Sequence, residues 1–419
     1  MHVATVFAGV PNPYEAGGML MHWASINALL DAGHKVTFVS LPWEQRSEER
    51  TEALRNLGVD VRVLTGAPQP PAPNGRWAAR AAYGRSLVWP ADQTLFPALA
   101  SAEDLAREIE YVQPDVVLAD GNSAVAAAHA LPLAKLAFVG DPPGESRLMR
   151  MQWDPLYAGR LSRDALLYRL GIHTFAFRAD RRMLGLLRSY DSAGIFGAHR
   201  AEWARQHGVN AWYVRSPIMD PVGAGWRRLR DAQPANPRPR ILLIGHLRGV
   251  ATISGLHVFV DDVLPKLTEA LGPTGFDVRI VGAYDPPASI AGVLEAHPAV
   301  QLVGHVEPPD EEFLRADVLL VSTPVETGPR VRILSAFSYG CCVVAHEANQ
   351  LGIPQLAHED NVLLADTPGL ARETLRALAD PLLRERLGSA GRELYESEFT
   401  PERAGARIVE ELQRIAGRP

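Results

Sequence analysis

The chain holds few lysines and few cysteines for its 419 residues. Its only lysines are Lys35, Lys135 and Lys266, so arginine supplies nearly all of the positive charge. A single arginine is therefore weaker evidence for a binding site here than in most proteins. The two cysteines, Cys341 and Cys342, are adjacent within an apolar run, which favours buried structural thiols over a disulfide or a metal site. This cysteine content fits a reducing cytosol.

Other absences exclude further classes of protein. The net charge of −6 gives no global reason to expect nucleic acid as a partner. No stretch reaches the ~18 to 20 uncharged residues of a membrane span. Residues 2–8 lack the basic region of a signal peptide and predict a strand instead. There is no Asp-x-Asp motif and no His or Cys cluster with the spacing of metal ligands. We therefore expect a cytoplasmic protein.

The stretch 321–345 predicts a strand end, a loop, a helix and a second strand. The apolar run 318–321 forms the first strand, and after Arg330 apolar residues recur with the spacing of a helix that Gly340 ends. The loop lies at the carboxyl end of a strand, which is where open parallel sheets bind ligands. Its residues are Glu326, Thr327, Gly328 and Pro329.

Arg330 and Arg332 stand at the start of this predicted helix, where the helix dipole disfavours positive charge. An anion would use both guanidinium groups together with the free backbone N–H groups, so we predict that a phosphate binds here. The alternative is that both are solvated surface arginines, and the arginine-rich composition supports it.

Residues 1–216 alternate between short apolar runs and helical patterns, which predicts a doubly wound α/β domain. The first run leads into a loop rich in proline and glycine and then into a helix. Gly17 and Gly18 lie at the start of that helix, where glycine lets a ligand approach the backbone and its free N–H groups. The alternative for this pair is an ordinary turn.

Residues 146–190 interrupt the alternation with a long, largely helical segment in which arginines and aromatic residues are interleaved. Such a segment can rest on an anionic membrane surface, so peripheral membrane contact through 147–188 is one interpretation. Two ordinary helices packed on the sheet are the other. Residues 66–75, rich in proline, predict a surface loop.

The chain is too long for one core, so we expect two domains. Residues 217–239 hold prolines and glycines without a periodic apolar pattern and predict a linker. A second α/β domain follows over 240–399, with a helix predicted at 256–271. Thr400 predicts an N-cap, with Pro401 in the first turn, for a last helix over about 400–419 that packs back on the first domain. The predicted fold class is α/β, with two doubly wound Rossmann-like domains facing a cleft.

Several segments of the second domain resemble, in the right order, those of the GT-B glycosyltransferases, specifically the large retaining family of sucrose-synthase-like and polysaccharide-assembly enzymes. RILLIGHL, which contains Gly245, is similar to the family's opening strand. VQLVGHV is similar to the strand whose end faces the nucleotide base, and it contains Gly304, His305 and Val306. GPRVRILSAFSYGCCVV resembles the family's helix motif, and EDNVLLAD its Glu-Asn-Gly-x-Leu segment. The likeness is closest over about 240–416.

The chain departs from the family around the predicted loop and helix. Two glutamates separated by seven residues are usual there; their positions hold Thr327 and Ser335, and Glu326 lies one residue from the first. The resemblance implies that Ser335 contacts the nucleotide ribose with a neutral hydroxyl, which is weaker than a charged contact.

The positive charge of the family's diphosphate site is also altered. An arginine and a lysine near the first strand of the second domain clamp the diphosphate in the family, and Arg248 alone represents them. Arg330 and Arg332 are the candidates to supply the missing charge. Where the family often has a His-Asp pair in the first domain, this chain has Gly140 and Asp141.

The resemblance implies a hexosyltransferase-like enzyme that moves a sugar from a nucleotide diphosphate-sugar, with retention, to a glycan, lipid-linked or small-molecule acceptor. Catalysis must stabilise negative charge on the departing diphosphate, and Arg330, Arg332 and Arg248 are the candidates. The family generally needs no metal, so we expect no cofactor beyond the donor. The implied nucleotide-binding residues are Gly17, Gly18, Gly245, Gly304, His305, Val306, Glu326, Thr327, Gly328 and Ser335.

Two alternatives stay open. The substitutions at Thr327 and Ser335 favour a degenerate, catalytically inactive member that keeps the fold as a nucleotide-binding or scaffold protein. An epimerase of nucleotide sugars would need convergent carboxylates that the sequence does not place. The histidines are dispersed and each is expected to be structural, with His22, just behind the glycine pair, as the one candidate for a further role.

Overall fold

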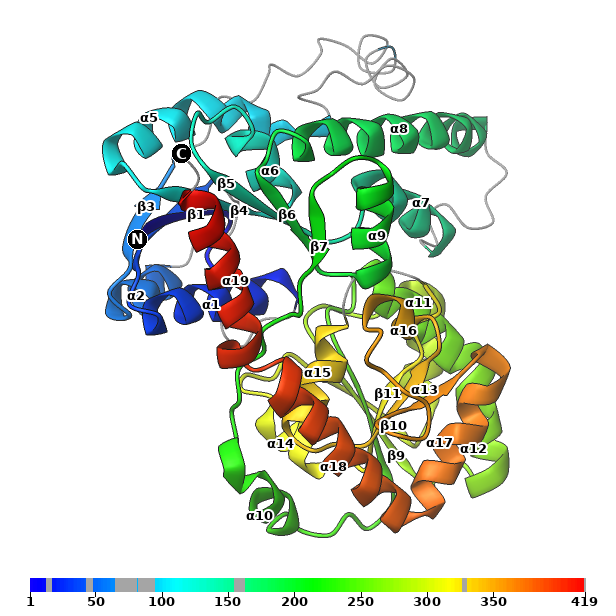
Figure 1. Ribbon diagram of the computed structural model, residues 1–419. Coiled ribbons are helices and arrows are strands. Elements are labelled where there is room, and N and C mark those ends of the chain that lie inside the picture. Colours follow the sequence, from blue (N-terminus) through cyan, green and yellow to red (C-terminus); the bar gives the residue numbers. More distant parts are fainter. Residues whose placement is uncertain are drawn as a thin grey trace.

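The computed structural model describes residues 1–12, 17–42, 48–64, 81, 95–153, 163–325 and 330–417, with the backbone alone described for 163–170. These residues form two parallel β-sheets, each covered by helices on both faces (Figure 1). The predicted loop at 66–75 lies outside the described residues, and so do Glu326, Thr327, Gly328 and Pro329.

The N-terminal sheet has seven strands in the order β3-β2-β1-β4-β5-β6-β7, which is a doubly wound topology. Its strands are β1 (His2–Ala8), β2 (Lys35–Leu41), β3 (Asp60–Val63), β4 (Val116–Asp120), β5 (Lys135–Val139), β6 (Ser192–Ile195) and β7 (Ala211–Tyr213). The helices are α1 (Gly18–Asp31), α2 (Glu48–Asn56), η1 (Pro97–Ser101), α5 (Ala102–Val112), α6 (Asn122–Ala128), α7 (Pro143–Trp153), α8 (Arg163–Leu187) and α9 (Ala198–Gln206).

The C-terminal sheet has six strands in the order β10-β9-β8-β11-β12-β13. Its strands are β8 (Arg240–Ile244), β9 (Asp277–Val281), β10 (Val300–Gly304), β11 (Val318–Val321), β12 (Val343–His346) and β13 (Leu363–Ala365). The helices from the linker onward are η2 (Gly223–Gly225), α10 (Trp226–Asp231), α11 (Val250–Val258), η3 (Phe259–Val263), α12 (Leu264–Leu271), α13 (Ala288–Ala296), α14 (Asp310–Arg315), α15 (Val331–Ser338), α16 (Asn349–Gly352), η4 (Thr367–Gly369), α17 (Leu370–Ala379), α18 (Pro381–Glu398) and α19 (Pro401–Ala416).

Continuous apolar runs explain the central strands, because a parallel strand is buried on both faces. Every residue of β4, β5, β11 and β12 is buried. One apolar cluster covers a face of each sheet and passes through the domain boundary, and it includes Leu118, Ile218, Leu319, Tyr395 and Phe399. The two domains therefore share part of their core.

The chain crosses between the domains twice, once before α10 and once between α18 and α19 (Figure 1). The Thr400 hydroxyl accepts a hydrogen bond from the Arg403 N–H at 3.3 Å, as an N-cap does, and Pro401 opens the helix. Helix α19 packs on α1 so closely that a Cβ on Gly405 would lie 2.4 Å from the Cβ of Ala28. The last helix thus rests on the first domain.

Three details differ from the sequence-based expectations. The helix predicted over 256–271 begins at Val250 and contains a π-helical turn, η3, before α12. The linker contains a short helix, α10, that the proline and glycine content hid. The helical segment 146–190 comprises two helices, α7 and α8, and no described helix is both long and apolar enough to cross a membrane.

Candidate functional site

Arg330 is the N-cap residue of α15 and its side chain is only 7% exposed. Its Nε donates to Asn349 Oδ1 at 3.1 Å, and its Nη2 donates to the Val325 carbonyl at 3.0 Å. These bonds hold the guanidinium group at the start of the helix, at the carboxyl end of β11. The alternative that Arg330 is a solvated surface arginine is wrong.

Arg332 reaches from the first turn of α15 to the opening strand of the domain. Its Nη2 donates to Thr252 Oγ1 on α11 at 2.9 Å, and a Cβ on Gly245 would lie 3.0 Å from its Cζ. Gly245 has a φ of 153°, so both the backbone and the arginine require glycine there. Arg332 thereby brings positive charge to the end of β8, where the sequence itself has no lysine.

Burial opposes the charge on both arginines. Burial first, and then the neighbouring Arg332, lower the pKa of Arg330 to about 9, while Asp141 acts in the opposite direction. Burial lowers the pKa of Arg332 to about 10. Both side chains are still cationic at neutral pH, and both lie at the positive end of a helix dipole. An anion at this place would relieve the cost of burying two like charges.

Asp141 connects this site to the first domain. It follows β5, and its charge acts on the pKa of Arg330, which stands at the carboxyl end of β11. Segments of the two domains meet beside them: His199 Nδ1 on α9 lies 2.7 Å from the Leu351 carbonyl oxygen on α16, and the Tyr213 hydroxyl at the end of β7 lies 3.3 Å from Gln355 Oε1. The carboxyl edges of both sheets therefore meet at the domain boundary.

The glycine pair lies on that same edge of the first sheet. Gly17 is the N-cap residue of α1 with a φ of 72°, and β1, β4 and β5 are neighbours in the sheet. Phe7 at the end of β1 underlies the pair, since its ring would lie 3.9 Å from a Cβ on Gly18. Gly17 needs its left-handed backbone, which supports glycine at this turn whether or not a ligand binds.

His22 lies one layer deeper, against the ring of Phe7. The two rings are stacked with centroids 4.7 Å apart, and His22 Nδ1 lies 2.8 Å from Asp120 Oδ2. Both His22 and Asp120 are buried. His22 Nε2 is buried without a hydrogen-bond partner in the described part of the chain. We expected a structural histidine with its hydrogen bonds satisfied, and this nitrogen departs from that expectation.

A small cavity lies beneath Arg332, between β8, β11, α11 and α15. Its polar lining is held by hydrogen bonds from two hydroxyls to α11: Ser322 Oγ donates to the Gly255 carbonyl at 2.7 Å, and Thr323 Oγ1 donates to the Ala251 carbonyl at 2.8 Å. Gly255 permits this close approach, because a Cβ there would lie 3.0 Å from Thr323 Oγ1.

The residues predicted to face the nucleotide base follow β10. The Gly304 carbonyl accepts a hydrogen bond from the Gly282 N–H at 2.8 Å, and Gly304 has a φ of 83°. His305 is exposed with its Nε2 3.0 Å from Glu307 Oε2, while Val306 packs against the apolar core. Their backbone is therefore fixed at the edge of the second sheet, and their role in base recognition stays a prediction.

Arg248 packs over an exposed aromatic ring. Its guanidinium carbon lies 4.9 Å from the ring centre of Tyr284, and the His246 ring lies 4.9 Å from the same ring. Tyr284 is 47% exposed and has a φ of 71°, which is rare for a bulky residue. This exposed aromatic group was not predicted, although a tyrosine between a glycine and two prolines after a strand is a usable signal.

Ser335 is half-buried and lies one turn after Arg332, on the same side of α15. Its carbonyl accepts a hydrogen bond from Ser338 Oγ at 2.7 Å. Thr252 and Asn349, which hold the two site arginines, were not predicted, because nothing local in the sequence links them to α15.

The second domain matches a known protein family. Residues 238–380, about a third of the chain, match a family model described as "Glycosyl transferases group 1". No curated protein sequence matches the chain.

Solved structures match along the whole length. Sucrose-phosphate synthase from Thermosynechococcus elongatus superposes with a TM-score of 0.67 at 15% identity, covering 99% of this chain and 98% of that one. HepE from Anabaena, in complex with UDP, has a TM-score of 0.66 at 14% identity, covering 99% and 100%. A glycosyltransferase from Rickettsia africae has a TM-score of 0.63 at 11% identity, covering 100% and 99%.

These identities are low, so the structural likeness defines the fold alone. The protein has the two-domain Rossmann-like fold of the GT-B glycosyltransferases, and that sequence-based prediction is confirmed. Its second domain carries the glycosyltransferase group 1 match.

Proposed function

We propose that this protein is a metal-independent glycosyltransferase that moves a sugar from a nucleotide diphosphate-sugar to an acceptor held on the first domain, with retention. Residues 1–216 then form the acceptor domain, 217–239 the linker and 240–399 the donor domain. The observation that carries the proposal is the pair of buried guanidinium groups at the start of α15. HepE, which shares the fold, binds UDP and UDP-glucose.

The chemistry follows from charge. As the bond between sugar and diphosphate breaks, negative charge grows on the departing diphosphate oxygen. Arg330 and Arg332 are fixed by Asn349 and Thr252 before any ligand arrives, so they need no reorganisation when that charge appears. The burial that lowers their pKa also excludes water, which strengthens their interaction with an anion. Both arginines lie on one side of the domain boundary and Asp141 on the other, which supports an acceptor held on the first domain, close to the reacting bond.

The acceptor includes lipid-linked glycans in this proposal, because α8 presents a basic and aromatic face. His173, Phe177 and Arg181 are exposed on successive turns of α8, and Phe177 is 65% exposed. This face suits peripheral contact with an anionic membrane, on its cytoplasmic side. Sedimentation with phosphatidylglycerol vesicles tests it: Phe177→Ser should reduce the bound fraction, and equal sedimentation with neutral vesicles would contradict the contact.

A turnover assay tests the function. The purified chain is incubated with nucleotide diphosphate-sugars that differ in base, with and without a mixture of glycan acceptors, and release of nucleoside diphosphate is followed by mass spectrometry. We expect release with one base and loss of release in Arg330→Ala. A nucleoside diphosphate that binds without any turnover would support the degenerate binding protein instead.

A further inference from the structure

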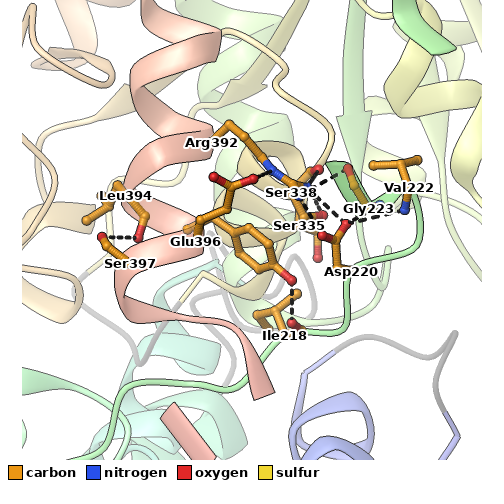
Figure 2. A network of polar contacts seen from close by, with 11 residues as sticks. Ile218, Asp220, Val222, Gly223, Ser335, Ser338, Arg392, Leu394, Glu396 and Ser397 are labelled. Carbon is orange, nitrogen blue, oxygen red and sulfur yellow. Dashed lines mark hydrogen bonds and ion pairs between the residues drawn. The ribbon is translucent and has the colours of Figure 1, made fainter. Parts of the chain in front are cut away.

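Arg392 is another buried arginine, at the opposite end of α15 from the candidate site. It lies on α18, is 2% exposed, and joins three segments that are distant in sequence (Figure 2). Its Nη1 donates to Asp220 Oδ1 at 2.9 Å and also to the Ser338 carbonyl. Its Nη2 donates to Asp220 Oδ2 at 2.5 Å and to the Gly223 carbonyl at 3.2 Å.

The contact with Ser338 fixes the carboxyl end of α15. Ser338 is the last residue of that helix, and its carbonyl is one of the groups that a helix leaves without an internal partner. A cation at this end is favoured by the helix dipole. Ser338 Oγ also donates to the Ser335 carbonyl. The series of hydrogen bonds that starts at Arg392 therefore continues back toward the turn that carries Arg332.

Two glycines of α18 bring the helices together. A Cβ on Gly391 would lie 2.4 Å from the ring of Phe337, and a Cβ on Gly388 would lie 2.2 Å from the Gly340 carbonyl oxygen. Neither position has room for a larger residue, so α15 lies directly against the backbone of α18. The orientation of α15 is therefore set by α18 along its carboxyl half.

The other contacts of Arg392 fix the interdomain linker. Asp220 Oδ1 also accepts hydrogen bonds from the Val222 and Gly223 N–H groups, at 3.3 and 2.8 Å. Beside them, the Tyr395 hydroxyl donates to the Ile218 carbonyl at 2.8 Å (Figure 2). The linker is thus attached to α18 just after it leaves the first domain.

We propose that Arg392 is a positioning residue that couples the linker to the ligand-facing helix α15. One guanidinium group holds both the carboxyl end of α15 and residues 220–223. A shift of the linker must therefore change the position of α15, and binding at Arg330 and Arg332 must change the freedom of the linker. This inference rests on the proposed function, because it takes a nucleoside diphosphate as the ligand.

The experiment compares Arg392→Lys with Arg384→Lys. Arg384 lies on the same helix and its Nη1 donates to the carbonyls of Ala377 and Leu378, both at 2.8 Å, at the end of α17. It also forms an ion pair with Asp317 at 3.4 Å. It serves as the control because it caps another helix and contacts neither α15 nor residues 220–223 in the described structure. Lysine keeps the charge at either position and loses the fork of donors.

Calorimetry with UDP, GDP and ADP gives the affinity, and hydrogen exchange at the Val222 and Gly223 amides reports the linker. We expect Arg392→Lys to weaken diphosphate binding by roughly 2- to 30-fold, the range for residues that couple sites without touching the ligand. Arg384→Lys should lower the melting temperature without changing affinity. Diphosphate should slow exchange at the two amides in the wild type and in Arg384→Lys, and not in Arg392→Lys.

The outcomes separate this inference from the proposed function. A wild-type chain that binds no nucleoside diphosphate overturns the proposed function, and the coupling with it. A wild type that binds, with equal affinity and equal linker protection in Arg392→Lys, overturns the coupling alone. Should Arg392→Lys fail to fold, Asp220→Asn removes the same link from the linker side and is judged by the same two measurements.

Discussion

Buried arginines lie at both ends of α15, Arg330 at its start and Arg392 of α18 at its carboxyl end, in opposite electrostatic settings. At the amino end, burial and a neighbouring cation lower the pKa of Arg330. At the carboxyl end, burial also acts against the charge of Arg392, but hydrogen bonds to Asp220 and Glu396 raise its pKa on balance. The carboxylate partners of Arg392 account for its burial as a structural feature. At the amino end, two cations lie side by side at the positive end of a helix, an arrangement that favours an anionic ligand.

The largest expected effect is on stability, and it separates the two ends. Arg392→Met should lower the free energy of unfolding by about 3–5 kcal/mol, because it removes the cation that pairs with Asp220 and the donor to the end of α15. Arg330→Met should cost less than about 2 kcal/mol, because relief of buried charge offsets the lost bonds to Asn349 and Val325. Urea unfolding of both variants measures the difference. Equal losses in the free energy of unfolding would show that the two arginines do not differ in their contribution to stability.

For ligand affinity we expect the opposite order, with the larger loss at Arg330. Arg330→Ala should weaken binding of a nucleoside diphosphate by roughly 1–3 kcal/mol, the range for losing a charge-assisted contact. Calorimetry at fixed salt measures it, with Arg279→Ala as the control, since Arg279 on β9 is already paired with Glu312 on α14. Unchanged affinity in Arg330→Ala would remove that residue from the site.

Ser335 sharpens the comparison, because it lies between the two ends. A neutral hydroxyl contributes about 0.5–1.5 kcal/mol where a charged group contributes 1.5–3, so Ser335→Glu should tighten binding of a nucleotide diphosphate-sugar. Its melting temperature should change little if the helix face is prepared for the ribose. Looser binding with a marked fall in melting temperature would favour the degenerate scaffold, where a new carboxylate finds no partner.

The smallest expected effect is on the pH dependence of stability, which should differ between Arg330 and Arg392. The folded-state pKa of Arg330, about 9, lies below its unfolded value. Above that pH the unfolded chain therefore binds more protons than the folded chain does. The wild type should therefore gain stability relative to Arg330→Met as the pH rises through 9. The raised pKa of Arg392 keeps its contribution present throughout that window. Urea unfolding at pH 7 and pH 10 checks the trend, and a loss of stability relative to Arg330→Met would contradict it.

The fold was largely predictable because its signals are local. Buried parallel strands are short apolar runs in the sequence. Thr400 and Pro401 mark the start of the last helix. The linker helix α10 was missed, because its contacts are made with distant elements: Arg230 donates to the carbonyls of Phe313 and Ala316. A sequence pattern does not contain such partners.

The site was predictable only in part. The place of Arg330 and Arg332 at a helix start follows from periodicity, and the structure shows that Arg330 is buried. That Arg332 reaches Thr252, or that Asp141 acts on Arg330 across the domain boundary, depends on tertiary packing. The candidates Glu326, Thr327 and Gly328 lie outside the described residues and stay predictions.

The central claim is that the amino end of α15 recognises a diphosphate. A thermal-shift comparison of nucleoside diphosphates with their parent nucleosides tests it most directly, because the two ligands differ only in the charged group. A ligand at a hundred times its dissociation constant stabilises the folded state by about 2.7 kcal/mol, which is a readily measured shift. We expect at least one diphosphate to raise the melting temperature while its nucleoside does not. No shift with any diphosphate, or an equal shift with the nucleoside, would contradict the account.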